Sequence, residues 1–257
     1  MTGHSQEETP RCEQRGEASS AACQPTEKLD GRGGQIARSS ARCEPAGRLS
    51  GCLEQAKESN DPPAQPRQAA TVILLRDRDG ARQARELQVL LVQRTAEARF
   101  MAGVWVFPGG SLDRAELASP HGHRLAALRE LREEAGISLG RDVELVAFSR
   151  WITPEAVKTR FDTHFFLAQA PANAAVILDG QECVDHRWIS PAQALRAHES
   201  GEMQLVFPTI KHLQRLSRFE TVAQLLEAAR KQPVQAVLPR IVLEDGSPRI
   251  VIPGETD

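Results

Sequence analysis

Tyrosine is absent from this chain of 257 residues, and its other aromatic residues are few, with eight phenylalanines and three tryptophans. No apolar run approaches the roughly 18 to 20 residues that a transmembrane helix needs, and no signal-peptide core follows Met1. An excess of one charge is also lacking, because 32 basic and 34 acidic residues leave a net charge of −2. This balance argues against nucleic acid or a membrane surface as a partner and predicts a cytoplasmic protein.

Large apolar residues are scarce in residues 1–68, which are rich in Ser, Gly, Glu, Gln, Arg and Pro. Such a composition buries too little apolar surface to offset the entropy of the chain. Four of the five cysteines lie in this segment without a CxxC pair, which disfavours a zinc site or a disulfide framework. We therefore expect a disordered tail over residues 1–68 and one folded domain over residues 69–257.

Strand and helix patterns alternate after residue 68. An apolar run predicts a first strand that starts at residue 69 and stops at a turn over residues 77–80. Further apolar runs predict strands at 87–93, 104–107, 143–152, 160–168 and 184–189. Helical spacing and caps predict helices at 124–135, 190–200, 208–218 and 220–232, and residues 241–252 resemble a terminal hairpin. This mixed order predicts an α/β or α+β fold with a mixed sheet between helices.

An acidic cluster stands out on the first of these helices. Residues three and four apart are neighbours on a helix, so Glu130 faces both Glu133 and Glu134. The three carboxylates repel one another close to the negative end of the helix dipole, at Gly136. The simple structural alternative is a solvated acidic face eased by Arg129 and Arg132. A cluster of hard oxygen ligands would instead suit Mg²⁺ or Mn²⁺, whose charge removes the repulsion.

These residues resemble the Nudix box, G-x5-E-x7-R-E-U-x-E-E-x-G-U, where U is aliphatic. Residues 129–137 match its second half at every fixed position, and Gly110 and Glu116 match its first half. The departure is a spacer, residues 117–128, that is longer than the family pattern by five residues. The insertion leaves open whether Glu116 or Asp113 takes the place of the first glutamate.

The resemblance implies an α/β/α sandwich and metal-dependent hydrolysis of a nucleoside diphosphate linked to another group. It implies that Glu130 and Glu134 are the principal ligands of Mg²⁺ or Mn²⁺, with Glu133 third and the carbonyl of Gly109 or Gly110 fourth. Arg129 would then orient the carboxylates. The general base of the family is either a box glutamate, such as Glu133, or a glutamate on a later loop, for which Glu182 is the candidate. A solvated loop carboxylate is the alternative for Glu182.

A second motif bears on the substrate. Residues 90–110 are similar to the motif of coenzyme A diphosphatases, L-L-T-x-R-S-x3-R-x3-G-x3-F-P-G-G, with Val92 and Thr95 as departures. Arg94 and Arg99 would grip the 3′-phosphate or the diphosphate of CoA, because a guanidinium can bind phosphate oxygens bidentately. Phe107 is a further candidate for substrate binding. Surface positions after a strand are the alternative for the two arginines.

Together these features predict a diphosphatase that cleaves CoA or acyl-CoA to adenosine 3′,5′-bisphosphate and (acyl-)4′-phosphopantetheine. Cleavage of ADP-ribose, NADH or another nucleotide is the enzymatic alternative. The second alternative is a non-catalytic nucleotide sensor. Such sensors often lose box glutamates, whereas Glu130, Glu133 and Glu134 are all present here. The expected partner is a small nucleotide diphosphate, and a homodimer is left open.

Overall fold

The computed structural model describes residues 63–79, 85–98, 101–140, 143–244, 247–252 and 254. Internal contacts divide the chain into residues 1–44 and 45–257, and all of the described residues belong to the second unit. Most of the tail expected over residues 1–68 therefore lies outside the described residues. Its disorder stays a prediction from composition.

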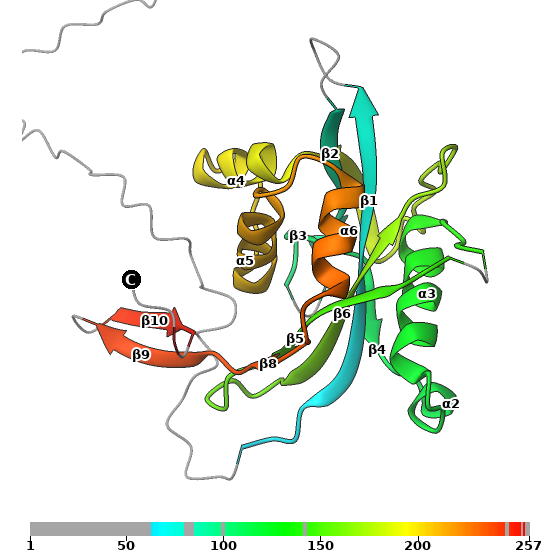
Figure 1. Ribbon diagram of the computed structural model, residues 1–257. Coiled ribbons are helices and arrows are strands. Elements are labelled where there is room, and N and C mark those ends of the chain that lie inside the picture. Colours follow the sequence, from blue (N-terminus) through cyan, green and yellow to red (C-terminus); the bar gives the residue numbers. More distant parts are fainter. Residues whose placement is uncertain are drawn as a thin grey trace, which may run out of the picture. The chain divides into compact units, whose positions relative to one another are not determined.

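A mixed sheet forms the centre of the fold (Figure 1). Its main path follows the order β3-β2-β1-β6-β5-β8, while β4 pairs with β1 and β7 pairs with β2. The pairing of β1 with β6 is parallel, and that of β1 with β2 is antiparallel. The strands are β1 (Arg67–Asp79), β2 (Arg85–Arg94), β3 (Trp105–Val106), β4 (Gly109–Ser111), β5 (Val146–Ile152), β6 (Phe161–Gln169), β7 (Cys183–Ile189) and β8 (Ala236–Val237).

Helices cover both faces of this sheet because β1 is apolar on both sides. Ala70, Val72 and Leu74 belong to one core, which they share with the apolar face of α3 (Gly122–Ala135). Ile73 and Leu75 alternate with them and join the other core, beneath α4 (Pro191–Glu199), α5 (Phe207–Leu216) and α6 (Val222–Arg230). Figure 1 shows α3 on one side of β1 and these three helices on the other. The predicted α/β/α sandwich with a mixed sheet is confirmed.

Several elements differ from their predicted bounds. β1 continues through Asp79, so no turn forms at residues 77–79, where antiparallel pairing with β2 continues instead. α3 begins at Gly122, two residues before the predicted start. The short elements β4, β8 and α2 (Arg114–Leu117) do not appear in the prediction at all.

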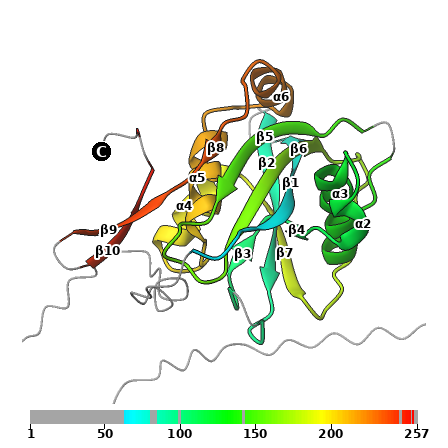
Figure 2. The same cartoon turned by 90° about the horizontal axis from the view of Figure 1, so that it is seen from below.

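The predicted terminal hairpin is present as β9 (Arg240–Glu244) and β10 (Ser247–Val251), which form a separate two-stranded sheet. In Figures 1 and 2 it stands beside the central sheet, connected to it through β8. β8 pairs in parallel with β5, so the segment that leads into the hairpin is anchored to the central sheet. Within the described residues, no helix is long and apolar enough to cross a membrane.

Candidate active site

The carboxylates of α3 are presented by a helix that is anchored through its opposite face. Ala126, Ala127, Leu131 and Ala135 are fully buried against the sheet. The helix ends at Gly136, whose left-handed φ of 67° allows its N–H to cap the carbonyl of Arg132. Glu130 and Glu134 consequently lie at the buried edge of the acidic face, and Glu133 is half exposed.

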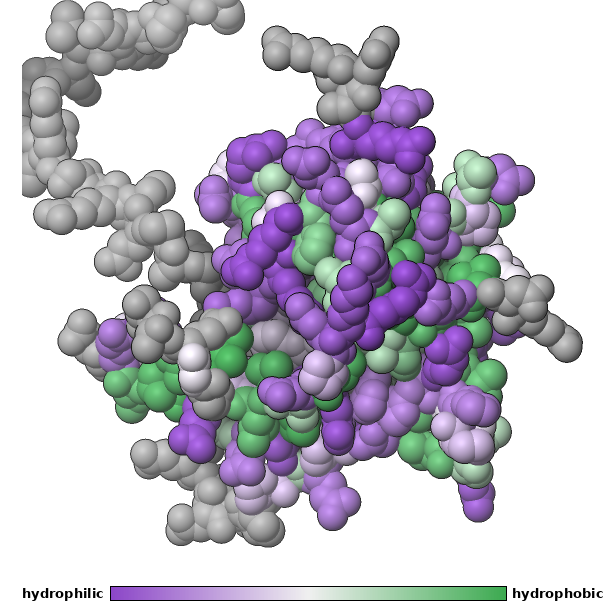
Figure 3. Space-filling view, in the orientation of Figure 1, coloured by the Kyte–Doolittle hydropathy of each residue, from purple (hydrophilic) through white to green (hydrophobic). Residues whose placement is uncertain are grey.

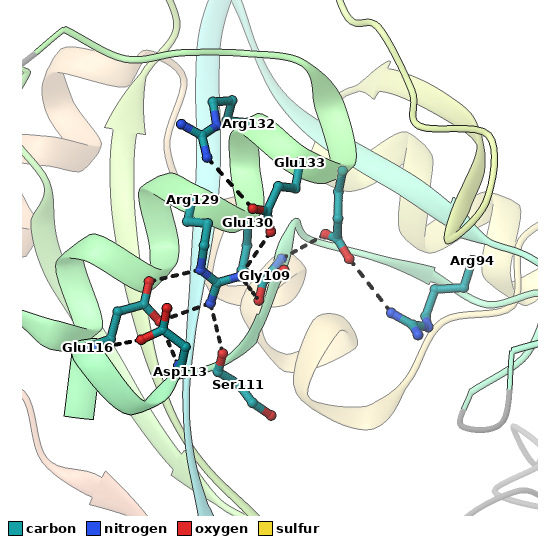
Figure 4. Close-up of polar contacts among 10 residues, drawn as sticks. Arg94, Gly109, Ser111, Asp113, Glu116, Arg129, Glu130, Arg132 and Glu133 are labelled. Atoms are coloured by element: carbon teal, nitrogen blue, oxygen red, sulfur yellow. Dashed lines mark hydrogen bonds and ion pairs between the residues drawn. The ribbon is translucent and has the colours of Figure 1, made fainter.

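Arg129 holds this acidic face together (Figure 4). Its Nη1 donates to Glu130 Oε1 at 2.8 Å and to Glu133 Oε2 at 3.0 Å. Its Nη2 donates to the carbonyl oxygen of Ser111 at 2.9 Å. The guanidinium is thereby fixed between α3 and the end of β4. This geometry is what the orienting role predicted for Arg129 requires.

Glu116, rather than Asp113, is the acidic partner of Arg129. Both Glu116 oxygens accept from the guanidinium at 2.9 Å, and these bonds hold the pKa of the Glu116 carboxyl below its ordinary value. Asp113 instead caps α2, since its Oδ1 accepts from the N–H of Glu116 at 2.7 Å while Glu116 Oε2 accepts from the N–H of Asp113. Of the two residues that the spacer left open, Glu116 is therefore the one that contacts Arg129.

Two glycines bring the backbone of β4 against the carboxylates. The N–H of Gly109 donates to Glu134 Oε2 at 2.9 Å. A Cβ at Gly109 would lie 2.6 Å from the carbonyl oxygen of Ala70, and a Cβ at Gly110 would overlap the Glu130 carboxylate. At Gly109 the neighbours include backbone atoms, so only glycine fits there, whereas a Cβ at Gly110 would displace the Glu130 carboxylate. The structure therefore brings Gly110, the predicted backbone ligand, together with Glu130.

The site is electrostatically suited to a cation. Burial raises the pKa of Glu134 to about 8, and the nearby charges of Glu130 and Glu182 add to this effect. Burial also raises the pKa of Glu130. Among the described residues, no three His, Cys, Asp or Glu side chains are already grouped as a metal cluster. The donors are nevertheless hard carboxylate oxygens whose negative charge is poorly solvated, and this set fits a divalent cation such as Mg²⁺ or Mn²⁺.

Arg94, at the end of β2, lies next to these carboxylates. Its Nη1 is 3.7 Å from Glu134 Oε1, and its buried Nε has no hydrogen-bond partner. Arg94 also lines the cavity, where a guanidinium is a suitable partner for phosphate oxygens. Arg99, its predicted companion, lies outside the described residues. Phe107 is only 4% exposed and belongs to the core, although it also lines the cavity of the site.

Glu182 lines the same cavity as Glu130 and Glu134. The loop that carries it is held by Asp179, which accepts from the N–H of Glu182 at 2.9 Å and from the N–H of Cys183 at 3.0 Å. The carbonyl of Glu182 in turn accepts from the N–H of Thr95 at 2.9 Å. The loop is therefore fixed beside the end of β2, close enough for the charge of Glu182 to raise the pKa of both box carboxylates.

The cavity itself was not foreseen from the sequence. It has a volume of ≈ 1420 Å³ and is lined by the acidic face of α3 as well as by apolar residues of β5, β6, α5 and the terminal hairpin. The hairpin was expected from two strand-like runs that flank the turn residues 245–248, but no local signal places it beside residues roughly a hundred positions earlier. Only the tertiary structure reveals this apolar wall.

Comparison with known proteins agrees with this geometry. Residues 65–208 match the NUDIX domain. The putative nudix hydrolase 7 of Caenorhabditis elegans is 28% identical over 165 residues, which cover 51% of this chain and 56% of that protein. The acyl-coenzyme A diphosphatase NUDT19 of Xenopus laevis is 34% identical over 85 residues, which cover 32% of this chain and 22% of that protein. The chain thus matches only about half of the length of the first of these curated relatives and less than a quarter of the length of the second.

A solved structure shows the same fold. The NUDIX hydrolase from Alicyclobacillus acidocaldarius superposes with a TM-score of 0.57 at 24% sequence identity. The match covers 66% of this chain and 99% of that one. The family match stops at residue 208, before the C-terminal hairpin begins.

Proposed function

The chain belongs to the NUDIX family, and on this premise we propose that it is a divalent-metal-dependent diphosphatase of CoA or acyl-CoA. The products are adenosine 3′,5′-bisphosphate and (acyl-)4′-phosphopantetheine. The observation that carries the proposal is the group of buried carboxylates, Glu130 and Glu134, held against the Gly109–Gly110 backbone at the mouth of a large cavity. A small nucleotide is the proposed partner, and a homodimer and a cytoplasmic location stay predictions.

Each residue of the box has a distinct proposed role. Glu130 and Glu134 bind the cation, with Glu133 and the Gly110 carbonyl completing the ligand set. When bound, the cation supplies charge that offsets the diphosphate oxygens and lowers the pKa of a coordinated water. Arg129 keeps the carboxylates aligned through its bonds to Glu116, Glu130 and Glu133.

Hydrolysis also requires a proton acceptor. A water oxygen attacks one phosphorus of the diphosphate, the bridging P–O bond breaks, and the leaving phosphate departs as the anion. Glu182 is the proposed acceptor of the water proton, because its loop is fixed by Asp179 and faces the carboxylate cluster. Glu133 is the alternative acceptor, being the most exposed glutamate of the box.

Two observations support CoA as the substrate. Arg94 lines the cavity beside Glu134, where its guanidinium can bind phosphate oxygens. Its motif resembles that of coenzyme A diphosphatases, and two of the relatives are named acyl-coenzyme A diphosphatase. The match covers less than a third of either relative. The proposed substrate is therefore based on the site rather than on the names of these relatives.

The test is turnover of CoA, acetyl-CoA, ADP-ribose and NADH by the purified chain with Mg²⁺ or Mn²⁺. The products are identified by chromatography, and Glu130→Gln serves as the matched inactive variant. We expect adenosine 3′,5′-bisphosphate from the CoA substrates. Activity confined to ADP-ribose or NADH would retain the metal site but discard the CoA assignment. Absence of turnover with all four compounds would favour a nucleotide sensor.

A further inference from the structure

The cavity divides into a charged end and an apolar end. Among the described residues that line it, the acidic and arginine side chains come from β2, α3 and the loop before β7: Arg94, Arg129, Glu130, Glu133, Glu134, Asp179 and Glu182. The residues that β5, β6, α5 and the hairpin contribute carry no charge. One end therefore suits a diphosphate with its cation, and the other suits an uncharged apolar group.

The apolar end is built largely from aromatic and branched side chains. Trp151 of β5 is only 8% exposed and meets Phe207 of α5 edge to face, with ring centroids 6.1 Å apart. Phe161 of β6 lines the same region. Ile241 and Ile250 complete the wall from the hairpin. Because they are cross-strand partners in β9 and β10, they project together on one face of the hairpin.

The hairpin is held in place by its connections to the central sheet. β8 pairs with β5 at Trp151 and Val237, shortly before the buried Pro239 and the partly buried Ile241. On the return, Ile252 packs against the core beneath α4, α5 and α6. The wall is thus attached at both ends to the structure that forms the rest of the cavity, although it lies beyond residue 208, where the family match ends.

We infer that this wall, Ile241 and Ile250 of the hairpin opposite Trp151, Phe161 and Phe207, binds the acyl chain of a thioester substrate and sets its preferred length. The inference rests on the proposed function and deepens it. The cavity volume of ≈ 1420 Å³ exceeds the roughly 300–1,000 Å³ of pockets for drug-sized ligands, so a nucleotide diphosphate leaves room for an additional group. Because the apolar end and the carboxylate end belong to one cavity, the group that occupies the apolar end is the tail of the same substrate.

The outer face of the hairpin provides a matched control. Val242, which alternates with Ile241 along β9, is 38% exposed and does not line the cavity. Figure 3 shows apolar side chains gathered over this region of the molecule. A substitution at Val242 therefore changes the same strand, at an adjacent position, without touching the proposed subsite.

The experiment measures kcat/KM for CoA, acetyl-CoA, hexanoyl-CoA and dodecanoyl-CoA in the wild type and in Ile250→Trp, Ile241→Trp and Val242→Trp. Each methylene that becomes fully buried should raise kcat/KM by up to about fourfold. We expect at least about a tenfold gain from acetyl-CoA to hexanoyl-CoA, since four methylenes are added and burial is partial. Either isoleucine variant should lose that gain while it retains acetyl-CoA turnover, and Val242→Trp should keep the full series.

Binding is measured in parallel, by calorimetry with EDTA present, for the same acyl-CoA series. If turnover is absent but the affinity still rises with chain length and falls in Ile250→Trp, the subsite stands and the proposed reaction fails. If CoA is hydrolysed with no dependence on chain length, the reaction stands and the subsite fails. A uniform change across all chain lengths in both isoleucine variants would also overturn the inference, because the wall would then contact no part of the chain.

Discussion

Acidification is expected to destabilise this protein through one buried imidazole, that of His212 in α5. The residue is only 2% exposed, and its Nε2 lies 2.6 Å from Ser149 Oγ. Four aromatic rings surround it at centroid distances of 4.2 to 6.3 Å: Phe107, Phe148, Trp151 and Phe165. An imidazolium in this apolar environment would lose its hydration without gaining a carboxylate partner.

Burial lowers the pKa of His212 from 6.5 to about 3, and the nearby Arg215 acts in the same direction. The carbonyl of Pro208 opposes the shift, but its geometry gives Nδ1 no hydrogen bond. Between these two pKa values the unfolded chain binds a proton that the folded chain does not. Stability from this residue is therefore complete above about pH 6.5 and falls as the pH falls toward 3.

The magnitude follows from the separation of the two pKa values. At about pH 4.5, two units below the unfolded pKa, the loss is about 2.7 kcal/mol relative to neutral pH, because one unit is worth about 1.36 kcal/mol. Two other histidines change stability in the same direction. Burial lowers the pKa of His164 to about 4, and it also lowers the pKa of His123, whose ring centroid lies 3.9 Å from that of His164. The contribution of His212 must therefore be isolated by difference.

The assay is urea unfolding from about pH 7.5 to 4.5 for the wild type, His212→Gln and Ser149→Ala. His212→Gln should be less stable at neutral pH but should flatten the pH curve by about 2.7 kcal/mol. Ser149→Ala leaves a buried imidazole nitrogen unpaired, costs about 1–3 kcal/mol at every pH, and keeps the wild-type slope. An unchanged slope in His212→Gln, or an NMR titration of His212 near 6.5, would refute the reasoning.

Three further predictions concern the proposed active site. Glu130→Gln should lower kcat by about 10³-fold in steady-state assays with the fold intact by circular dichroism, because it removes metal-mediated charge stabilisation of several kcal/mol; wild-type activity would refute the metal assignment. Arg94→Ala should raise KM for CoA by about 10- to 100-fold, and Arg94→Lys should recover only part of this, since a lysine cannot bind phosphate bidentately. Gly110→Ala should abolish activity because its Cβ overlaps the Glu130 carboxylate, whereas Gly140→Ala, where the Cβ meets nothing within 4 Å, should leave activity unchanged.

Local sequence signals predicted the long elements of this fold well. Gly136 ends α3 where the sequence places it, and Ser190 followed by Pro191 begins α4, with Ser190 Oγ accepting from the N–H of Gln193. These features depend on contacts within a few residues. The continuous apolar run that starts at residue 69 likewise predicted β1, and both faces of this strand are buried.

The elements that escaped prediction depend on distant partners or on a signal that was overlooked. β4 contains two glycines, which are poor strand formers, and it exists because Gly109 and Gly110 pair with Thr71 and Ala70 of β1. β8 has only two residues and is defined by its pairing with β5. α2 was foreseeable, since Asp113 and Glu116 form a capping box with the spacing that marks a helix start.

The inserted spacer shows why a departure from a family pattern need not disturb the site it interrupts. The N–H of Ser119 donates to the carbonyl of Glu116, and the N–H of Gly122 donates to the carbonyl of Ser119. The chain thereby turns back on itself, and Gly122 lies so close to Glu116 that a Cβ would overlap its carbonyl. The extra residues are absorbed in this turn, so α3 starts beside α2 and Glu116 still reaches Arg129. Sequence spacing alone measures the length of an insertion, whereas the position of α3 depends on the path that the insertion takes.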